Sequence, residues 1–468
     1  MKLGMNLGFA ATSGGGGAPA DPYASLLALF AADEPGEVWP VHEDYLFTDT
    51  ACTTPVSAVG DEIQGWLGAK YGVKFTSSTA GRMPKYARQP VGGWTQQFLE
   101  TEDLSASPWT RLNTTVTSGQ SDPDGGSNAW LLTCTTTGNA ANLTQICSRG
   151  NGAHTYSWIV KAGTVNRVLM TMYKTGGYSD NIFDTSTGTW PVADGTVTQA
   201  ATDLGSGWWR ISLTFTGAIS DTTQPVFIVC PIDNAGTAYN STTIGNTIYI
   251  YHPMHNSGSS PGTYEARGSA VEGPATGESV AAIWFDGDSD GMSTPAVNLT
   301  STNETTIWWG WDKHLATNTV GVIIESSSDI NFNDGIFRVA ENGVIGGASA
   351  NRYYFSGKGN AMLSQYLTEQ MTARHRAVGG LAIDLSAGAS ALSARVTDAN
   401  GTFTTLATDS GTTTGTGNFG NHTFHCGTRG GGTGLDAHGY MIGALVVLGR
   451  APTGTEFADT VTTLGGLV

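Results

Sequence analysis

DGDSDGMSTPAVNLT (286–300) opens the part of the chain that decides the fold, and DANG (398–401) and HGYMIGALVVLGRAPTGTEFADTVTTL (438–464) follow it in order. The first stretch is an acidic turn that leads into a strand, and the second is typical of a β-hairpin turn. The third is an apolar strand that runs into a helix, whose start is marked by Thr453 and Glu456 at the spacing of a capping box. Together they predict a β-sandwich closed by a short C-terminal helix.

The composition is that of a β protein. Among 468 residues, 64 glycines and only 13% charged residues favour many short strands joined by tight turns. This length allows two or three domains. The net charge of −17 would repel a phosphate backbone, and no apolar run is long enough to span a membrane. We therefore expect neither nucleic acid as a partner nor insertion into a membrane.

The pattern divides the chain into three segments, residues 1–90, 91–265 and 266–468. The first opens with a glycine tract that is too weakly apolar for a signal peptide, so we expect folding in a cytoplasm. Its one convincing helix, DPYASLLALFAAD (21–33), has an apolar face and is too short to be stable without docking on another surface. A Gly/Ser/Pro-rich join at 256–279 is expected to be a linker.

Alternation of apolar and polar residues predicts strands throughout the second and third segments. In the second segment, strands are predicted at 153–163, 166–174, 207–217, 223–233 and 245–254. In the third, they are predicted at 305–313, 320–328, 334–343, 376–386, 392–411 and 438–450. The spacing in the second segment favours a jelly-roll sandwich. The predicted fold class is therefore all-β and multidomain, a jelly roll followed by a second β-sandwich, with a small N-terminal segment.

Several segments, taken in order, resemble the modular fibre and spike proteins of tailed bacteriophages and phage-like particles. They are LALFAADEPGEVW (27–39), LFTDTACTTPVSAVGDEI (46–63), SPWTRLNTTVT (107–117), SDPDGGSNAW (121–130), SWIVKAG (157–163), LGSGWWRISLTFTG (204–217) and IWFDGDSDG (283–291). The match departs from the family pattern at VWPVHEDYL (38–46), where the usual Asp-rich turn after the tryptophan is replaced. The last segment resembles a concanavalin-like or laminin-G-like β-sandwich.

The resemblance implies a role for each segment. Residues 1–90 would form a virion-attachment segment that contacts other virion proteins, and residues 91–265 would form a jelly roll similar to carbohydrate-binding modules. Residues 266–468 would form a lectin domain presented outward. The resemblance also implies a location on the virion surface, assembly as a homotrimer, and a bacterial surface polysaccharide as the partner.

Candidate glycan-binding residues lie in two places of the third segment. Trp308, Trp309 and Trp311 crowd one predicted strand, and alternation puts Trp308 on the face opposite to the other two. Trp308 is therefore the candidate for stacking on a sugar ring, with a core position as the alternative. The flexible, glycine-rich loop 417–439 offers polar groups that can hydrogen-bond vicinal hydroxyls. The alternative is a loop that is disordered or packs against a subunit. Its candidates are Asn418, Asn421, Arg429, Asp436 and His438.

The sequence predicts no metal site and no cofactor. Asp286, Asp288 and Asp290 alternate as in the first half of a calcium loop, but Val297 stands where an EF-hand needs a bidentate Glu. A tight acidic turn is the favoured interpretation. The five cysteines are odd in number and form no CxxC pair, so all are predicted to be free thiols. A hairpin pair of Cys134 and Cys147 is the alternative.

The sequence thus predicts a virion fibre or spike protein that binds host-cell glycans and has no catalytic residues. No pair of carboxylates is recognisable as acid and nucleophile, and neither a GxSxG elbow nor an HExxH motif nor a phosphate-binding loop is present. Two alternatives stay open. One is a purely structural head or tail decoration protein, and the other is a polysaccharide depolymerase.

Overall fold

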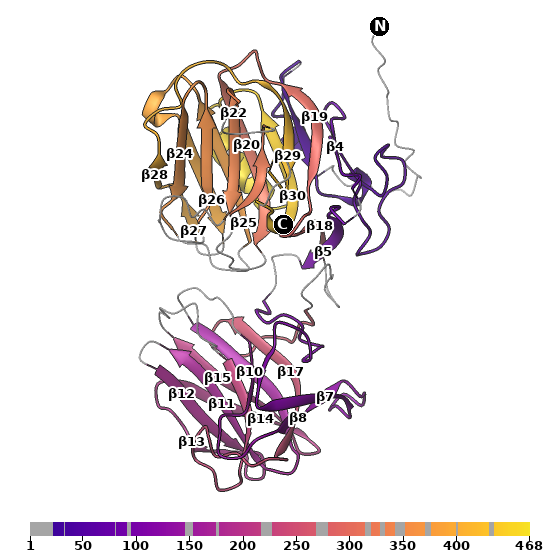
Figure 1. Ribbon diagram of the computed structural model, residues 1–468, viewed down its shortest axis with the longest axis vertical. Helices are drawn as coiled ribbons and strands as arrows, with labels where there is room; N and C mark the ends of the chain where they lie inside the picture. Colours follow the sequence, from indigo (N-terminus) through magenta and orange to yellow (C-terminus); the bar gives the residue numbers. More distant parts are fainter. Residues whose placement is uncertain are drawn as a thin grey trace, which may run out of the picture.

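The chain folds into two β-sandwich domains, shown one above the other in Figure 1. The computed structural model describes residues 22–31, 33–79, 81–90, 95–145, 153–174, 177–216, 227–267, 279–313, 320–327, 333–341, 352–369, 376–398, 401–429 and 435–468. Nearly all regular structure in these residues is strand, which confirms the all-β fold class.

The middle of the chain forms the jelly roll, a sandwich of two six-stranded antiparallel sheets. One sheet, called the groove sheet below, has the order β13 (Thr189–Val192), β12 (Gly177–Asp184), β11 (Arg167–Lys174), β16 (Phe227–Ile232), β9 (Asn142–Gln145) and β6 (Thr110–Leu112). The other has the order β14 (Thr198–Gly205), β15 (Trp208–Thr216), β10 (Ala153–Ala162), β17 (Thr247–Ser257), β8 (Ala129–Cys134) and β7 (Thr114–Gln120). The five strands predicted for this segment are confirmed.

The second sandwich, called the terminal sandwich, packs an eight-stranded sheet on a ten-stranded one. The eight-stranded sheet has the order β27 (Gly401–Phe403), β26 (Leu392–Asp398), β25 (Arg376–Asp384), β20 (Glu304–Lys313), β30 (His438–Leu448), β18 (Ser279–Asp286) and β5 (Lys85–Pro90), with β1 (Gly36–Pro40) also paired to β30. The ten-stranded sheet has the order β2 (Leu46–Phe47), β3 (Gly65–Leu67), β4 (Lys74–Thr76), β19 (Met292–Asn298), β29 (Asn421–Cys426), β21 (Gly321–Glu325), β22 (Ile336–Glu341), β23 (Tyr354–Lys358), β24 (Met362–Leu367) and β28 (Leu406–Ser410). Two 3₁₀ turns, Glu43–Tyr45 and Gly388–Ser390, also belong to this domain.

The prediction of a separate N-terminal segment is wrong for residues 36–90. These residues supply strands to both sheets of the terminal sandwich, and in Figure 1 the indigo β4 and β5 lie beside β19 and β18. Trp39, Trp66 and Phe75 are each fully buried in the same core as Trp309 and Trp311. The physical reason is that these apolar side chains can be buried only against a partner sheet, which a short segment cannot build alone.

The jelly roll is inserted into what would otherwise be a β-hairpin of the terminal sandwich. Pro90, the last residue of β5, is paired directly with Ser279, the first residue of β18. Paired Cα atoms lie about 5 Å apart, so the whole jelly roll leaves and returns at one point of the sheet edge. The two ends of the insert also lie together, since the N–H of Thr101 donates to the carbonyl oxygen of Arg267 at 2.9 Å. The domains are therefore joined by two adjacent chain crossings.

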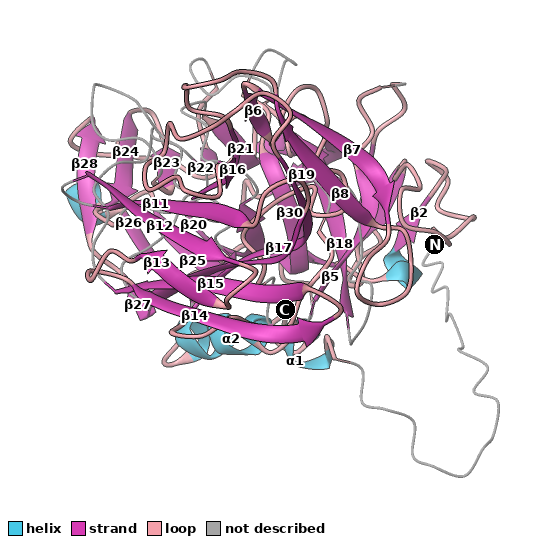
Figure 2. Ribbon diagram, turned by 90° about the horizontal axis from the view of Figure 1, so that it is seen from below, coloured by secondary structure: helices cyan, strands magenta, loops and turns pink. Residues whose placement is uncertain are grey.

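Two short helices cover the outer face of the eight-stranded sheet, and Figure 2 shows them side by side. They are α1 (Ala24–Leu27) and α2 (Glu456–Gly465), and neither helix in the described part of the chain is long and apolar enough to cross a membrane. The docked face predicted for the first helix is confirmed, because Tyr23, Leu26 and Phe30 are buried there. Asp21, the first residue of the predicted helical segment, lies outside the described residues.

The start of α2 is fixed by ion pairs and a partial capping box. The N–H of Thr453 donates to the Glu456 carboxylate at 2.8 Å, which confirms the spacing seen in the sequence. Arg450 donates to Glu456 through both terminal guanidinium nitrogens, at 2.6 and 2.7 Å, and its Nε pairs with Glu34 at 2.9 Å. These contacts link the segment before β1 to the C-terminal helix, on the far side of the sheet from the core.

Candidate functional site

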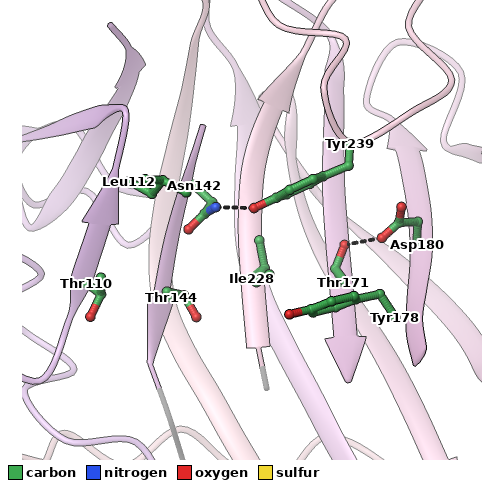
Figure 3. A pocket seen from close by; sticks show the side chains of 9 residues that line it. All are labelled: Thr110, Leu112, Asn142, Thr144, Thr171, Tyr178, Asp180, Ile228 and Tyr239. Atoms are coloured by element: carbon green, nitrogen blue, oxygen red, sulfur yellow. Dashed lines mark hydrogen bonds between the residues drawn. The ribbon is translucent and has the colours of Figure 1, made fainter. Parts of the chain in front are cut away.

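An open groove with a volume of about 380 Å³ lies on the outer face of the groove sheet (Figure 3). Alternation along the strands creates this face. On β11, Met170 and Met172 belong to the core, whereas Thr171 between them faces the groove. The groove is lined by Thr110, Leu112, Asn142, Thr144, Thr171, Tyr178, Asp180, Ile228 and Tyr239.

The lining residues come from five adjacent strands, β6, β9, β16, β11 and β12, and from the loop after β16. Four interstrand spacings separate β6 from β12, which amounts to about 19 Å across the sheet. A groove that crosses strands over this distance matches an extended chain ligand better than a single small molecule. Its lining combines apolar surface with few polar groups, as is usual for ligand sites.

Tyr239 forms one wall of the groove and is held in place from two directions. Its loop is fastened by Asp233, whose carboxylate accepts hydrogen bonds from Asn246 at 2.6 Å and Thr243 at 3.2 Å. The Asn142 side-chain amide donates to the hydroxyl oxygen of Tyr239. Burial raises the pKa of Tyr239 to about 12, so the phenol keeps its proton at neutral pH. The hydroxyl can therefore still donate a hydrogen bond to a ligand.

Polar atoms on the groove floor are placed for hydrogen bonding. Thr144 is 5% exposed, and its hydroxyl has no hydrogen-bond partner among the described residues. The Thr171 hydroxyl donates to the Asp180 carboxylate at 2.7 Å, across a directly paired position of β11 and β12. The Thr144 hydroxyl oxygen is itself shielded from solvent, so of these groups it is the Asp180 carboxylate that borders the groove.

Two large apolar side chains of the groove remain in contact with solvent. Tyr178 is 50% exposed and Leu112 is 47% exposed, and they lie on strands at opposite sides of the groove. Together with Tyr239 they offer aromatic and aliphatic surface, with hydroxyl, amide and carboxylate groups between them. Sugar rings have the same character, since their C–H faces are apolar and their edges carry hydroxyl groups. The groove can therefore bind a glycan by stacking and hydrogen bonding.

Trp308 is not an exposed sugar-stacking residue, so that prediction is wrong. Its side chain is 0% exposed and packs against Phe457 of α2, with ring centroids 5.9 Å apart. The face opposite to the core is covered by the two helices, so alternation places Trp308 in a second buried layer. The alternative of a core position is therefore confirmed for Trp308, and Trp309 and Trp311 are fully buried between the sheets.

The structure does not bring the five loop candidates together. Residues 421–426 form β29 in the middle of the supposed loop, about 17 Å long at the usual rise per residue. Asn418 and Asn421 lie at one end of this strand, where the Asn418 amide donates to the Thr300 carbonyl oxygen at 2.8 Å. Arg429, Asp436 and His438 follow its other end. The prediction that 417–439 is one continuous flexible loop is therefore wrong.

The second group lies beside the acidic turn after β18. His438 is paired with Asp286, and its ring contacts the Trp284 ring edge-on at 5.2 Å. Asp436 accepts a hydrogen bond from Thr428 at 2.6 Å. Burial, and then the nearby charge of Asp286, raise the pKa of Asp436 above its ordinary value despite this hydrogen bond. Among the described residues, no three His, Cys, Asp or Glu side chains are grouped so that they could hold a metal ion.

Asp290 of the same turn is expected to make stability depend on pH. Its side chain accepts the N–H of Asp286 at 3.0 Å, and burial together with the Asp286 charge raises its pKa to about 7. The folded state thus binds the proton more tightly than the unfolded state, so this contribution to stability is present at low pH and is lost as pH rises from about 4 to 7.

We therefore expect Asp290→Asn to be more stable than wild type at pH 8 by about 2 kcal/mol, after allowance for screening near the surface. The two proteins should be nearly equal at pH 4. Denaturant unfolding at a series of pH values measures the difference. A constant difference across this range would show that Asp290 titrates normally.

The thiols described by the structure are Cys52, Cys134, Cys230 and Cys426, and none of them forms a disulfide. Cys147 lies outside the described residues, so the alternative pair with Cys134 is not tested. Instead, Cys134 and Cys230 meet at one end of the jelly roll, where both sulfur atoms contact the carbonyl oxygen of Pro231. That all five cysteines are free stays a prediction.

Comparison with known proteins gives structural likeness alone. No family model matches the chain, and no curated protein matches it. A crystal structure of the LG1-3 region of the laminin alpha2 chain is similar at 12% identity and a TM-score of 0.26, covering 66% of this chain and 64% of that one. Domains LG4-5 of the mouse laminin alpha1 chain are similar at 10% identity and a TM-score of 0.23, covering 68% of this chain and 92% of that one. These neighbours are laminin G-like sandwiches, and scores this low add nothing about function.

Sequence reasoning missed every residue of the groove. The signal was weak but present: on β12, Tyr178 and Asp180 alternate with the buried Ser179 and Asn181, so both point to one face. Such a pattern shows that two side chains share a face. It does not show whether that face is exposed to solvent. If another part of the chain packed on this face, the same two side chains would be buried.

Proposed function

We propose that this chain is a glycan-binding fibre or spike protein of a tailed bacteriophage or similar particle, and that the groove of the jelly roll holds the bacterial surface polysaccharide. The observation that supports glycan binding is the groove itself, where the exposed ring of Tyr178 and the wall formed by Tyr239 flank polar groups from neighbouring strands. The similarity of segments between 27 and 291 to phage fibre proteins supports the particle. Binding therefore belongs to the jelly roll in this proposal, rather than to the terminal sandwich.

Weak individual sites suit such a protein. An open groove with few hydrogen bonds binds a glycan modestly, and many copies on one particle convert modest affinity into firm attachment. A homotrimer, and contacts with other virion proteins through the N-terminal residues, belong to the proposal on the strength of the resemblance alone.

Loss of the exposed ring should weaken glycan binding without affecting the fold. We expect Tyr178→Ala to lower the affinity of the full chain for host polysaccharide about fivefold, because one stacking contact contributes about 1 kcal/mol. Tyr71→Ala is the matched control, since Tyr71 is 49% exposed and lies on the other domain. Binding to a glycan array and to host cells measures both variants, with release of reducing ends followed alongside.

Each other outcome has a clear meaning. If Tyr178→Ala and Tyr71→Ala bind the glycan equally well, the groove is not the glycan-binding site. Absence of glycan binding by the wild-type chain would favour the structural decoration protein, and release of reducing ends would favour the depolymerase.

A further inference from the structure

Asp180 is the single charged residue among the nine that line the groove. It lies on β12 opposite Thr171, whose hydroxyl binds one carboxylate oxygen at 2.7 Å. Among the described residues Asp180 forms no ion pair, and its second carboxylate oxygen has no hydrogen-bond partner. Figure 3 shows the carboxylate beside Tyr178 and Tyr239, at the edge of the space between them.

The lining of the groove offers nothing to balance this charge. None of the nine residues is Lys, Arg or His, and the chain as a whole carries a net charge of −17. A ligand that enters the groove replaces water around the carboxylate with its own atoms, so its charge next to Asp180 is poorly screened. An anionic group would be repelled there, whereas a hydroxyl or an ammonium group could donate to the second carboxylate oxygen.

We propose that Asp180 is a specificity-determining residue, which makes the groove select glycans that are uncharged or bear an amino group and reject acidic polysaccharides. This inference rests on the proposed function of the groove. The Thr171 hydroxyl holds the carboxylate in one orientation, so the selection depends on a fixed charge instead of a freely rotating surface side chain. Rejection by an unpaired like charge is an effective way to discriminate between ligands of similar shape.

The test compares three linear probes of matched length: glucosamine oligomers, N-acetylglucosamine oligomers and galacturonate oligomers. Binding of each to the full chain is measured by calorimetry at low and high salt. The variants are Asp180→Asn, which keeps the shape, and Asp203→Asn, which removes the same charge from β14 on the other sheet of the jelly roll.

For the wild-type chain we expect the amine-bearing probe to bind best and the acidic probe to bind worst. Asp180→Asn should weaken the amine-bearing probe about tenfold and strengthen the acidic probe by a similar factor, with little change for the N-acetylated probe. High salt should reduce these differences. Asp203→Asn should behave as wild type, because a charge outside the groove is screened.

The result that overturns the inference is an Asp180→Asn variant that ranks the three probes as wild type does while still binding them. In that case the groove binds glycans, but Asp180 does not select them, and the proposed function stands. If the wild-type chain binds none of the three probes and no host glycan, the proposed function and this inference both fail.

Discussion

A fragment comprising residues 279–468 should fail to fold on its own. It contains every strand of the lectin domain predicted at 266–468, but it lacks β1, which pairs with β30 over five residues, and β5, which pairs with β18 over six. It also lacks Trp39, Trp66 and Phe75, which are completely buried in the intact core. Burial of three such aromatic side chains contributes about 10 kcal/mol or more, as much as the whole stability of a typical domain.

A second fragment serves as the control, because it contains the strands that residues 279–468 lack and still omits the jelly roll. Residues 22–90 joined through a two-residue Asn-Gly turn to residues 279–468 should fold, since Pro90 and Ser279 are already paired and such a turn connects antiparallel strands. Residues 95–267 should fold separately as the jelly roll, because its core is formed within this range. Near-ultraviolet circular dichroism and cooperative thermal unfolding distinguish the three fragments. Cooperative unfolding of residues 279–468 alone would mean that the N-terminal strands are dispensable.

Replacement of Trp308 by alanine should destabilise the terminal sandwich by about 3–5 kcal/mol, the usual cost of removing a fully buried aromatic side chain. The ring fills the layer between β20 and α2, and its indole N–H donates to the Phe457 carbonyl oxygen at 3.3 Å. The variant should therefore show a lower denaturant midpoint for this domain and leave the glycan affinity of the jelly roll unchanged.

Trp284 provides a comparison within the same domain. It is 6% exposed and lies on β18 among smaller side chains, so Trp284→Ala should also destabilise the fold, by a smaller amount. If the Trp308→Ala variant keeps its stability but loses binding to host cells, Trp308 contacts the glycan after all.

The sequence alone predicted β10, β11, β15, β16 and β17 of the jelly roll and β20, β21, β22, β25, β26 and β30 of the terminal sandwich. It did not predict β6, β9 and β12, which line the groove. Strands such as β10, β11 and β15 were predicted to within about two residues, because each alternates between a buried and an outer face and ends at glycine or polar turn residues. The capping contact of Thr453 with Glu456 was predictable for the same reason, since it depends on residues three positions apart. These features depend only on residues within a few positions of one another, so the sequence is sufficient to predict them.

Sites were predicted poorly because their residues come from distant parts of the chain. The groove is lined by residues of β6, β9, β16, β11 and β12 and of the loop after β16. These residues meet only when the sheet forms, so no spacing in the sequence indicates that they share a site. The loop 417–439 looked like one binding surface because its polar residues are close in sequence. Once β29 forms, a strand length separates its two ends.

For the strands that it predicted, the sequence by itself determined the approximate bounds and the alternation of the two faces, because those properties depend on neighbouring residues. The tertiary structure decided what covers each face. Helix α2 buries Trp308, whereas no described element closes over Tyr178. Only the tertiary structure also showed that residues 36–90 complete the terminal sandwich, with the jelly roll inserted between Pro90 and Ser279. Strands so far apart in the chain pair only where a sheet edge and an apolar surface are left unpaired by the rest of the fold. A local sequence pattern does not show which edges and surfaces those are.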